Sequence, residues 1–295
     1  MKKIIFIICT EKGTLEKKSI LLVKSIRKFA GKYKNCDILS FSPRKGEEIS
    51  VKGREELNKL GVKHYNIPLN TMYTDYPLAN KPLVCSYVEK NYKSDYLIFL
   101  DSDKLILNEP SEIVFDSKYD LALRPVDIKN IGSNGEDENS VYWKKLYNIL
   151  NITEYNYVTT TVDKEKVFQY WNSGFISIKS GKKIFQLWKE NFEKIMRLNI
   201  QPKQGTFFLE QSIFAATVSS LNLNVIELSK GYNYPIHIQR NLEGFKRLDE
   251  LVSIHYHHIL ESFDFVKNIL DLDMHEDTRE FLIKNIAVIE KIKND

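Results

Sequence analysis

The sequence predicts an α/β fold with a mostly parallel central sheet and helices on both of its faces. Segments with strand character alternate with segments of helical spacing through the first hundred residues, as βαβ units require. Ile4–Cys9 is a continuous apolar run rich in isoleucine, and Tyr96–Leu100 is a second run of this kind. Strands covered on both faces read as uninterrupted apolar runs, so we expect both at the centre of the sheet.

The other elements of the first half follow from spacing and from turn residues. Leu15–Phe29 is expected to be a helix, because Ile20, Val23 and Ile26 recur on one stripe. Arg54–Leu60 is expected to be a helix that Gly61 ends. The remaining expected elements are strands at Asp37–Phe41 and Val62–Ile67 and a helix at Pro82–Tyr92.

The second half is more mixed. Its clearest amphipathic helix is Ser180–Leu198, in which Ile184, Trp188 and Phe192 lie in register. Asn130–Asn139 is rich in Gly, Asn, Asp and Ser, so we expect a mobile loop there. The other expected elements are strands at Phe175–Ile178, Asn224–Leu228 and Val252–His257, a helix at Phe207–Leu221 and a terminal helix from about Glu276.

The composition is that of a globular protein. Hydrophobic residues make up 43% of the chain and charged residues 28%, and the net charge is +4. No segment concentrates Lys and Arg with interleaved aromatics, so a nucleic-acid partner is not expected. The three cysteines, Cys9, Cys36 and Cys85, fit no metal knuckle or CxxC pair and predict a reducing compartment. The apolar stretch at the N-terminus is too short for a secretory signal, and no segment approaches the roughly 20 apolar residues of a membrane span. We therefore expect a cytoplasmic protein without a transmembrane segment.

Two aspartates, Asp101 and Asp103, follow the central strand Tyr96–Leu100. Ligand sites of open α/β sheets lie at the carboxyl ends of strands, and residues two apart on extended chain point the same way. Two carboxylates so placed repel each other unless a cation lies between them, so the pair predicts a divalent metal. A polar turn without metal is the structural alternative. An EF-hand loop is excluded, because Leu105 and Ile106 stand where it needs an oxygen ligand and a glycine.

A second polar cluster lies near the end of the last expected strand, in Val252–His258. His255 and His257 alternate onto one face of that strand. Imidazole together with carboxylate is a ligand set that suits Mn²⁺. An aromatic-rich strand edge without metal is the alternative for this cluster.

Four short segments occur in a fixed order along the chain: Phe99–Asp103, Trp171–Phe175, Leu209–Gln211 and Ile254–Tyr256. They resemble the DxD, NSG, DQ and late-histidine motifs of GT-A glycosyltransferases, especially those related to glycosyltransferase family 8. The resemblance covers the chain from Ile4 to about His258. It implies a GT-A-type nucleotide-diphospho-sugar transferase fold and a hexosyltransferase that uses a nucleotide-sugar donor, a UDP-sugar in this family. It also implies a saccharide or glycoconjugate acceptor, Mn²⁺ or Mg²⁺ as cofactor, and retention of the anomeric configuration.

The resemblance also implies roles for single residues. Asp101, Asp103 and His255 would bind the metal, and Asp101 would in addition contact the donor ribose. The residues expected against the nucleotide donor are Cys9, Thr10, Lys81, Asp101 and Ser102. Those expected at the reaction centre are Asn172, which would face the reacting sugar, Gln211, near the anomeric centre, and Glu210, near the acceptor or donor hydroxyls.

The chain departs from the family pattern at two places. Glu210 stands where the family has an aspartate. The basic segment that follows the late histidine in the family is absent, which leaves the diphosphate contacts on that side open. His257 or His258 could supply them.

With no linker, internal repeat or low-complexity tract, we expect a single catalytic domain over 1–295. Within it, 1–107 would form the nucleotide-binding half, 108–260 the acceptor and metal half, and 261–295 a helical segment. The loop Asn130–Asn139 would close over the site.

Two other functions remain as alternatives. A sugar nucleotidyltransferase would need a Gly-rich basic loop after the first strand, but Cys9–Thr14 holds one glycine and one acid. A non-catalytic carbohydrate- or nucleotide-binding protein would have no need of the carboxylates and of His255.

Overall fold

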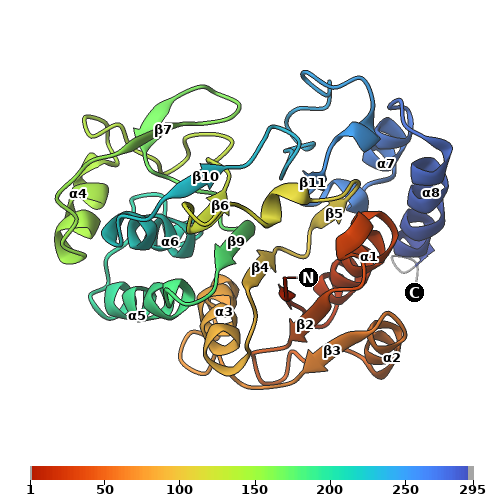
Figure 1. The fold of residues 1–295 in the computed structure, drawn as a ribbon, viewed down its shortest axis with the longest axis horizontal. Helices are drawn as coiled ribbons and strands as arrows, with labels where there is room; N and C mark the ends of the chain where they lie inside the picture. The colour runs from red at the N-terminus through yellow and green to blue at the C-terminus, as the bar shows by residue number, and fades with distance from the viewer. Residues whose placement is uncertain (1, 292–295) are drawn as a thin grey trace.

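The computed structural model describes residues 2–291, and at its centre lies a 7-stranded sheet (Figure 1). The strand order is β10-β6-β9-β4-β1-β2-β3. Only β9 runs antiparallel to its neighbours within this sheet, so the predicted mostly parallel sheet is confirmed. The strands are β1 (Ile4–Cys9), β2 (Asp37–Phe41), β3 (Val62–Tyr65), β4 (Tyr96–Leu100), β6 (Leu121–Leu123), β9 (Phe175–Lys179) and β10 (Val225–Glu227).

Two small antiparallel pairs complete the strands. β5 (Lys104–Ile106) follows β4 directly and pairs with β11 (Ser253–His255), which comes almost 150 residues later. β7 (Tyr157–Thr159) and β8 (Lys166–Phe168) form a hairpin. The β5–β11 pair matters for function, because it brings the late histidines to the end of the central strand.

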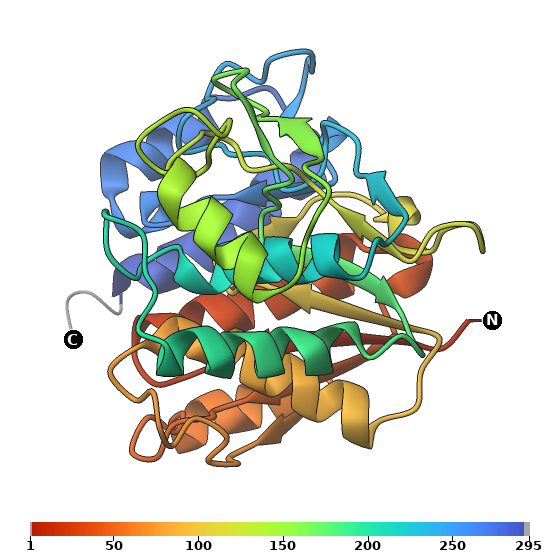
Figure 2. The same cartoon turned by 90° about the vertical axis from the view of Figure 1, so that its left-hand side faces the viewer.

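Helices cover both faces of the central sheet, as its apolar strands require. Alternate residues of β1 enter different cores: Phe6 and Ile8 pack on one side, Ile5 and Ile7 on the other. The first core is closed by α1 (Thr14–Phe29) and α2 (Val51–Lys59). The second core, seen from its side in Figure 2, is closed by α3 (Asn80–Asn91), α4 (Ser140–Ile149), α5 (Ile184–Arg197) and α6 (Leu209–Ser220). None of the helices within residues 2–291 is both long enough and apolar enough to cross a bilayer.

The last two helices pack beside α1 (Figure 1). They are α7 (Phe263–Leu270) and α8 (Glu276–Lys291). Phe281 of α8 meets Phe29 at the end of α1 edge to face, with ring centroids 5.0 Å apart. This third core also takes in Leu105 of β5 and Ile254 of β11, so the C-terminal helices support the small sheet from behind.

Most elements begin or end within a few residues of the expected bounds. α2 begins at Val51, because the Ser50 hydroxyl accepts a hydrogen bond from the Gly53 amide and caps the helix. α5 begins at Ile184 instead of Ser180, because the chain turns at Gly181 with a φ of +110°. The elements not anticipated are short or lack a clear period: α4, β5, β6, β7, β8 and α7.

The loop Asn130–Asn139 folds around the side chain of Asp137. Asp137 organises it by accepting hydrogen bonds from the Ser133 hydroxyl at 2.8 Å and from the Asn134 amide at 2.9 Å. The same carboxylate forms an ion pair with Lys129 at 2.9 Å. Side chains rich in turn-forming polar groups thus satisfy the backbone of the loop locally.

Candidate active site and metal centre

A cleft of about 440 Å³ opens at the carboxyl ends of β1 and β4. The end of β6, the segment before β9, the start of α6 and the end of β11 also contribute side chains. Apart from Thr10, every site residue predicted from the sequence lines this cleft: Cys9, Lys81, Asp101, Ser102, Asp103, Asn172, Glu210, Gln211 and His255.

Thr10 does not line the cleft, contrary to the prediction from the sequence. Its hydroxyl accepts a hydrogen bond from Ser40 at 2.8 Å, and its amide pairs with the Phe41 carbonyl, so the residue is wholly buried next to β2. The chain stays extended there, which turns Cys9 and Glu11 toward the cleft and Thr10 away from it. The two-residue period, applied past the end of β1, would have selected Glu11 instead.

Glu11 is a cleft residue that the sequence analysis missed. Its side chain is buried and pairs with Arg44, whose Nη2 lies 2.6 Å from Oε2 and whose Nε lies 3.0 Å from Oε1. A bidentate contact of this kind satisfies both oxygens of a buried carboxylate. The end of β1 therefore carries a neutralised acid where the donor pocket is expected.

The reversed strand β9 brings the Asn172–Gly174 segment against Asp101. Phe175 pairs with Leu100, and the Asp101 amide donates to the Gly174 carbonyl at 2.8 Å. A Cβ atom at Gly174 would lie 2.5 Å from Asp101 Oδ2, so glycine permits this close approach. The Asn172 side chain accepts a hydrogen bond from the Gly174 amide at 2.8 Å and lines the cleft.

Gln211 supports this turn from α6. Its Oε1 accepts from the Ser173 amide at 3.0 Å, and its Nε2 donates to the Tyr170 hydroxyl at 2.9 Å. Both ends of the amide are thus bonded to protein, and the side chain is buried. The geometry favours a positioning role for Gln211 beside the direct role predicted from the motif.

Lys81, at the start of α3, joins two carboxylates in the floor of the cleft. Its Nζ lies 3.0 Å from Asp101 Oδ2 and 3.1 Å from Glu210 Oε1. Burial alone lowers the pKa of Lys81, but the two carboxylates outweigh it and hold that pKa above its usual range. Lys81 therefore stays charged and fixes the positions of both acids.

Glu210 is buried, and only one of its oxygens is fully engaged. Oε1 accepts from the Ser173 hydroxyl at 2.9 Å and contacts Lys81, whereas Oε2 has no hydrogen-bond partner among the described residues. Burial raises the pKa of Glu210, which the charge of Lys81 partly offsets. An unpaired buried acceptor that lines a cleft is available to a ligand hydroxyl.

Lys104, the residue after the aspartate pair, is a second buried cation. Its Nζ donates to the Asn233 side chain and lies behind Gly174, close to Asp101. Burial lowers its pKa, while Asp101 and Asp103 act to raise it. Its burial could have been predicted from the sequence, because Lys104 directly follows the two acids and is itself followed by an apolar run.

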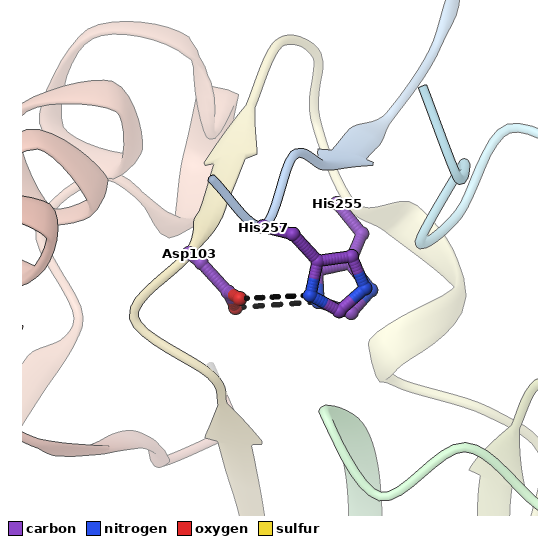
Figure 3. Close-up of side chains that lie close together, drawn as sticks. All are labelled: Asp103, His255 and His257. Atoms are coloured by element: carbon purple, nitrogen blue, oxygen red, sulfur yellow. Dashed lines mark ion pairs between the residues drawn. The ribbon is translucent and has the colours of Figure 1, made fainter. Parts of the chain in front are cut away.

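Asp103, His255 and His257 form a compact cluster (Figure 3). Asp103 Oδ1 lies 3.3 Å from His255 Nε2, and Asp103 Oδ2 lies 3.4 Å from His257 Nδ1. The ligand atoms of all three lie within 4.8 Å of one another. Antiparallel pairing sets this arrangement, because β11 places His255 opposite Lys104 and the Tyr256 amide donates to the Asp103 carbonyl at 3.1 Å.

His257 joins the cluster by a different route from the one expected. β11 ends at His255, and His257 has a φ of +49°, so the two imidazoles do not alternate along one strand. The left-handed turn brings the His257 ring to within 3.9 Å of the His255 ring, centroid to centroid.

Asp101 does not join the cluster. The chain turns at Ser102 and Asp103 instead of staying extended, so the two carboxylates face different partners. Asp101 turns to Lys81, and Asp103 turns to the imidazoles. The expectation that both acids share one face is therefore wrong for this structure.

The protonation states of the cluster suit a cation. Burial lowers the pKa of His255 to about 3, so its imidazole is neutral at neutral pH and offers a lone pair. Burial also acts to raise the pKa of Asp103, but its contacts with the imidazoles outweigh this and hold the pKa well below its usual range. His255 Nδ1 is buried with no partner among the described residues. Neutral imidazole and ionised carboxylate are donors that could hold a divalent transition metal.

Comparison with known proteins decides the family. Residues 6–222 match the family model of the Rhodobacterales glycosyltransferase domain. The chain belongs to this family. It is thus a glycosyltransferase, and the predicted enzyme class is confirmed; the narrower resemblance to family 8 stays a prediction.

The fold of this glycosyltransferase is also found in a solved structure. The chain is similar to the WbbM bifunctional glycosyltransferase in its apo structure, with a TM-score of 0.55 and 18% sequence identity. The match covers 96% of this chain and 52% of WbbM, so the chain spans about half the length of that protein. This likeness, with the observed sheet, confirms the predicted fold class. No curated protein sequence matches the chain.

Proposed function

We propose that this glycosyltransferase transfers a sugar from a nucleotide-sugar donor to a saccharide or glycoconjugate acceptor with the help of a divalent metal. The observation that carries the proposal is one cleft that holds both the Asp103–His255 pair and the Lys81–Asp101–Glu210 network. The motif resemblance adds a UDP-sugar donor and retention of the anomeric configuration.

Asp103 and His255 would hold the ion, which would be Mn²⁺ or Mg²⁺. Bound there, it would stabilise negative charge on the diphosphate of the departing nucleotide. The neutral His255 ring and the ionised Asp103 supply the lone pairs, and their backbones are held by the β5–β11 pairing. Cys9 and Ser102, at the ends of β1 and β4, would lie against the nucleotide.

The sugar would lie toward Lys81 and the start of α6. Asp101 and Glu210 are oriented there by Lys81, and Asn172 borders the same part of the cleft. Glu210 Oε2 is free to accept a hydrogen bond from a hydroxyl of the donor or acceptor. Preorganised charge in a buried site acts on the transition state without reorganisation during the reaction.

The nucleotidyltransferase alternative gains no support from this geometry. A triphosphate cradle needs backbone amides and cations after β1, but Glu11 and its partner Arg44 occupy that position. Arg44 is already engaged by Glu11 and by the Thr74 carbonyl.

The function is tested by binding and by turnover. Calorimetry with UDP, GDP, CDP and ADP, each with and without Mn²⁺, is expected to show tight binding of one nucleotide, UDP, that needs the metal. Incubation with a panel of UDP-sugars and acceptor saccharides should then release UDP. Turnover of a nucleoside triphosphate with a sugar phosphate, or nucleotide binding that ignores the metal, would contradict the proposal.

A further inference from the structure

We propose that His257, and not Asp101, is the third protein ligand of the metal, which gives a centre of two imidazoles and one carboxylate that prefers a transition-metal ion to Mg²⁺. The inference rests on the metal dependence proposed above. It departs from the motif, in which both aspartates of the pair would bind the ion.

Asp101 is held away from the cluster by its own contacts. Its Oδ2 lies 3.0 Å from Lys81 Nζ, and the Lys81 side chain, which is only 11% exposed, is shared with Glu210. The Gly174 backbone lies directly behind the same oxygen. A move of this carboxylate toward Asp103 would break its ion pair with Lys81 and would bring two carboxylates of like charge together.

His257 already points at the carboxylate that the ion would need. Its Nδ1 lies 3.4 Å from Asp103 Oδ2, about the same separation as the 3.3 Å between His255 Nε2 and Asp103 Oδ1. Figure 3 shows one carboxylate facing both rings. An ion between these three side chains would replace the direct contacts without a change of fold.

The backbone of His257 is strained, and neighbouring groups hold it in place. A left-handed φ of +49° is uncommon for a residue with a side chain, and such strain persists only where the surroundings impose it. Lys18, itself buried, donates to the His257 carbonyl at 2.8 Å and pairs with Glu261 at 2.7 Å. A solvated surface histidine would gain nothing from this conformation, whereas a ligand gains a fixed position.

His237 fixes the ring of His257 from the other side. The two rings meet edge to face, with centroids 4.2 Å apart and an interplanar angle of 89°. His237 Nδ1 lies 3.2 Å from the His255 carbonyl oxygen, so His237 is tied to the strand that carries the other imidazole. The orientation of His257 is therefore set before any ion binds, as metal sites require of their ligands.

The ligand set has a consequence for the choice of metal. Mg²⁺ takes oxygen ligands almost exclusively, whereas imidazole suits Mn²⁺ and the later transition metals. With Asp101 as third ligand the site would hold two oxygens and one nitrogen; with His257 it holds one oxygen and two nitrogens. We therefore expect Mn²⁺ to bind clearly more tightly than Mg²⁺.

The test is Mn²⁺ calorimetry on the full chain without nucleotide. His257→Ala should weaken Mn²⁺ binding by at least roughly 10- to 100-fold. That is the usual effect of losing a residue that only hydrogen-bonds a metal ligand, and the loss of a ligand itself should cost no less. The matched control is His275→Ala, because the His275 side chain is 64% exposed and pairs with Asp249 instead of Asp103; this variant should bind Mn²⁺ like the wild type. Asp101→Asn should change Mn²⁺ affinity by less than a few-fold.

A spectroscopic measurement makes the assignment independent of stability. Pulsed electron paramagnetic resonance of bound Mn²⁺ should detect two coupled imidazole nitrogens in the wild type and one in His257→Ala. Wild-type Mn²⁺ affinity in His257→Ala together with a large loss in Asp101→Asn would overturn the inference. If Asp103→Asn then still abolished binding, the proposed metal dependence would stand; a wild type that binds no divalent ion would remove both.

Discussion

At the scale of single residues, Lys81 and Glu210 show how burial in the cleft leaves a charged pair with one carboxylate oxygen unpaired. Lys81 keeps its charge because two carboxylates face it. Lys81 and Ser173 both contact Glu210 Oε1, and Oε2 has no hydrogen-bond partner among residues 2–291. A buried, unpaired acceptor is normally avoided, and its presence beside a cleft indicates a ligand contact. Glu210 reaches Lys81 from the first turn of α6.

We predict that Glu210→Gln strongly slows transfer with little effect on binding. Glutamine keeps the shape but loses the charge, so Mn²⁺ and nucleotide affinity should change less than a few-fold. Transfer should fall by roughly 100-fold or more if the carboxylate acts mainly in the transition state. Turnover assays and calorimetry on the same preparation separate the two effects. The control is Glu190→Gln, an exposed position on α5, and a proportional loss of nucleotide affinity in Glu210→Gln would place the residue in the donor pocket instead.

At the scale of elements, two antiparallel pairings assemble the site on an otherwise parallel sheet. β9 runs against β4 and carries Asn172 to Asp101, and β11 runs against β5 and carries His255 to Asp103. Both pairings join the end of the central strand to segments that come much later in the chain. With parallel pairing, the amino end of β9 and the carboxyl end of β11 would each lie at the far end of the partner strand, away from Asp101 and Asp103.

We predict that Gly174→Ala disrupts the β4–β9 junction. The added Cβ would lie 2.5 Å from Asp101 Oδ2 and 3.0 Å from Lys104 Nζ, so the acid must shift away from Lys81. We expect a loss of roughly 1–3 kcal/mol in the free energy of unfolding, as overpacking causes, and weaker donor binding. Gly231→Ala is the control, because its Cβ would meet nothing closer than 3.4 Å. Equal unfolding midpoints for the two variants in urea would show that the junction tolerates the methyl group.

At the scale of the whole molecule, the site concentrates ionisable groups that are buried by folding. His255 lies against Lys104 and Asp103, and burial together with Lys104 disfavours its protonated form. Burial also lowers the pKa of His237 to about 4. The unfolded chain has no such burial, so its histidines titrate near the ordinary value of about 6.5. The folding free energy of the metal-free protein must therefore depend on pH.

We predict that the metal-free protein loses stability as the pH falls from about 6.5 toward 4. In this range the His255 side chain takes up a proton in the unfolded chain but stays neutral in the folded protein. The free energy of unfolding therefore falls by up to about 1.4 kcal/mol per pH unit for this group. Asp103, whose pKa is lowered in the folded state, adds a loss only near and below its ordinary pKa of about 3.9. Urea unfolding in the presence of a chelator at pH 7 and pH 5 measures the slope. His255→Gln should reduce the slope without removing it, because His237 still contributes, and the exposed His258→Gln should not reduce it; equal slopes in all three proteins would contradict the assignment.

The sequence by itself determined the central strands of the sheet and most of the residues that line the cleft. Ile4–Cys9 and Tyr96–Leu100 are apolar on both faces, which only central strands are, and two acids directly after such a strand lie at its carboxyl end in any α/β fold. These properties are local, so spacing and composition contain them. The same holds for the amphipathic helix α5, whose buried stripe is visible in its residues alone.

Only the tertiary structure decided which of these groups meet. Asp101 and Asp103 are two residues apart, yet a turn sends one to Lys81 and the other to His255, which no period predicts. Thr10 and Glu11 are adjacent in the chain, yet Thr10 packs beside β2 whereas Glu11 lines the cleft. Lys104 and His257 acquire their positions from the β5–β11 pairing and from a left-handed turn. The physical reason is that contacts between distant segments depend on register and on burial, which are properties of the packed chain and not of any short stretch of it.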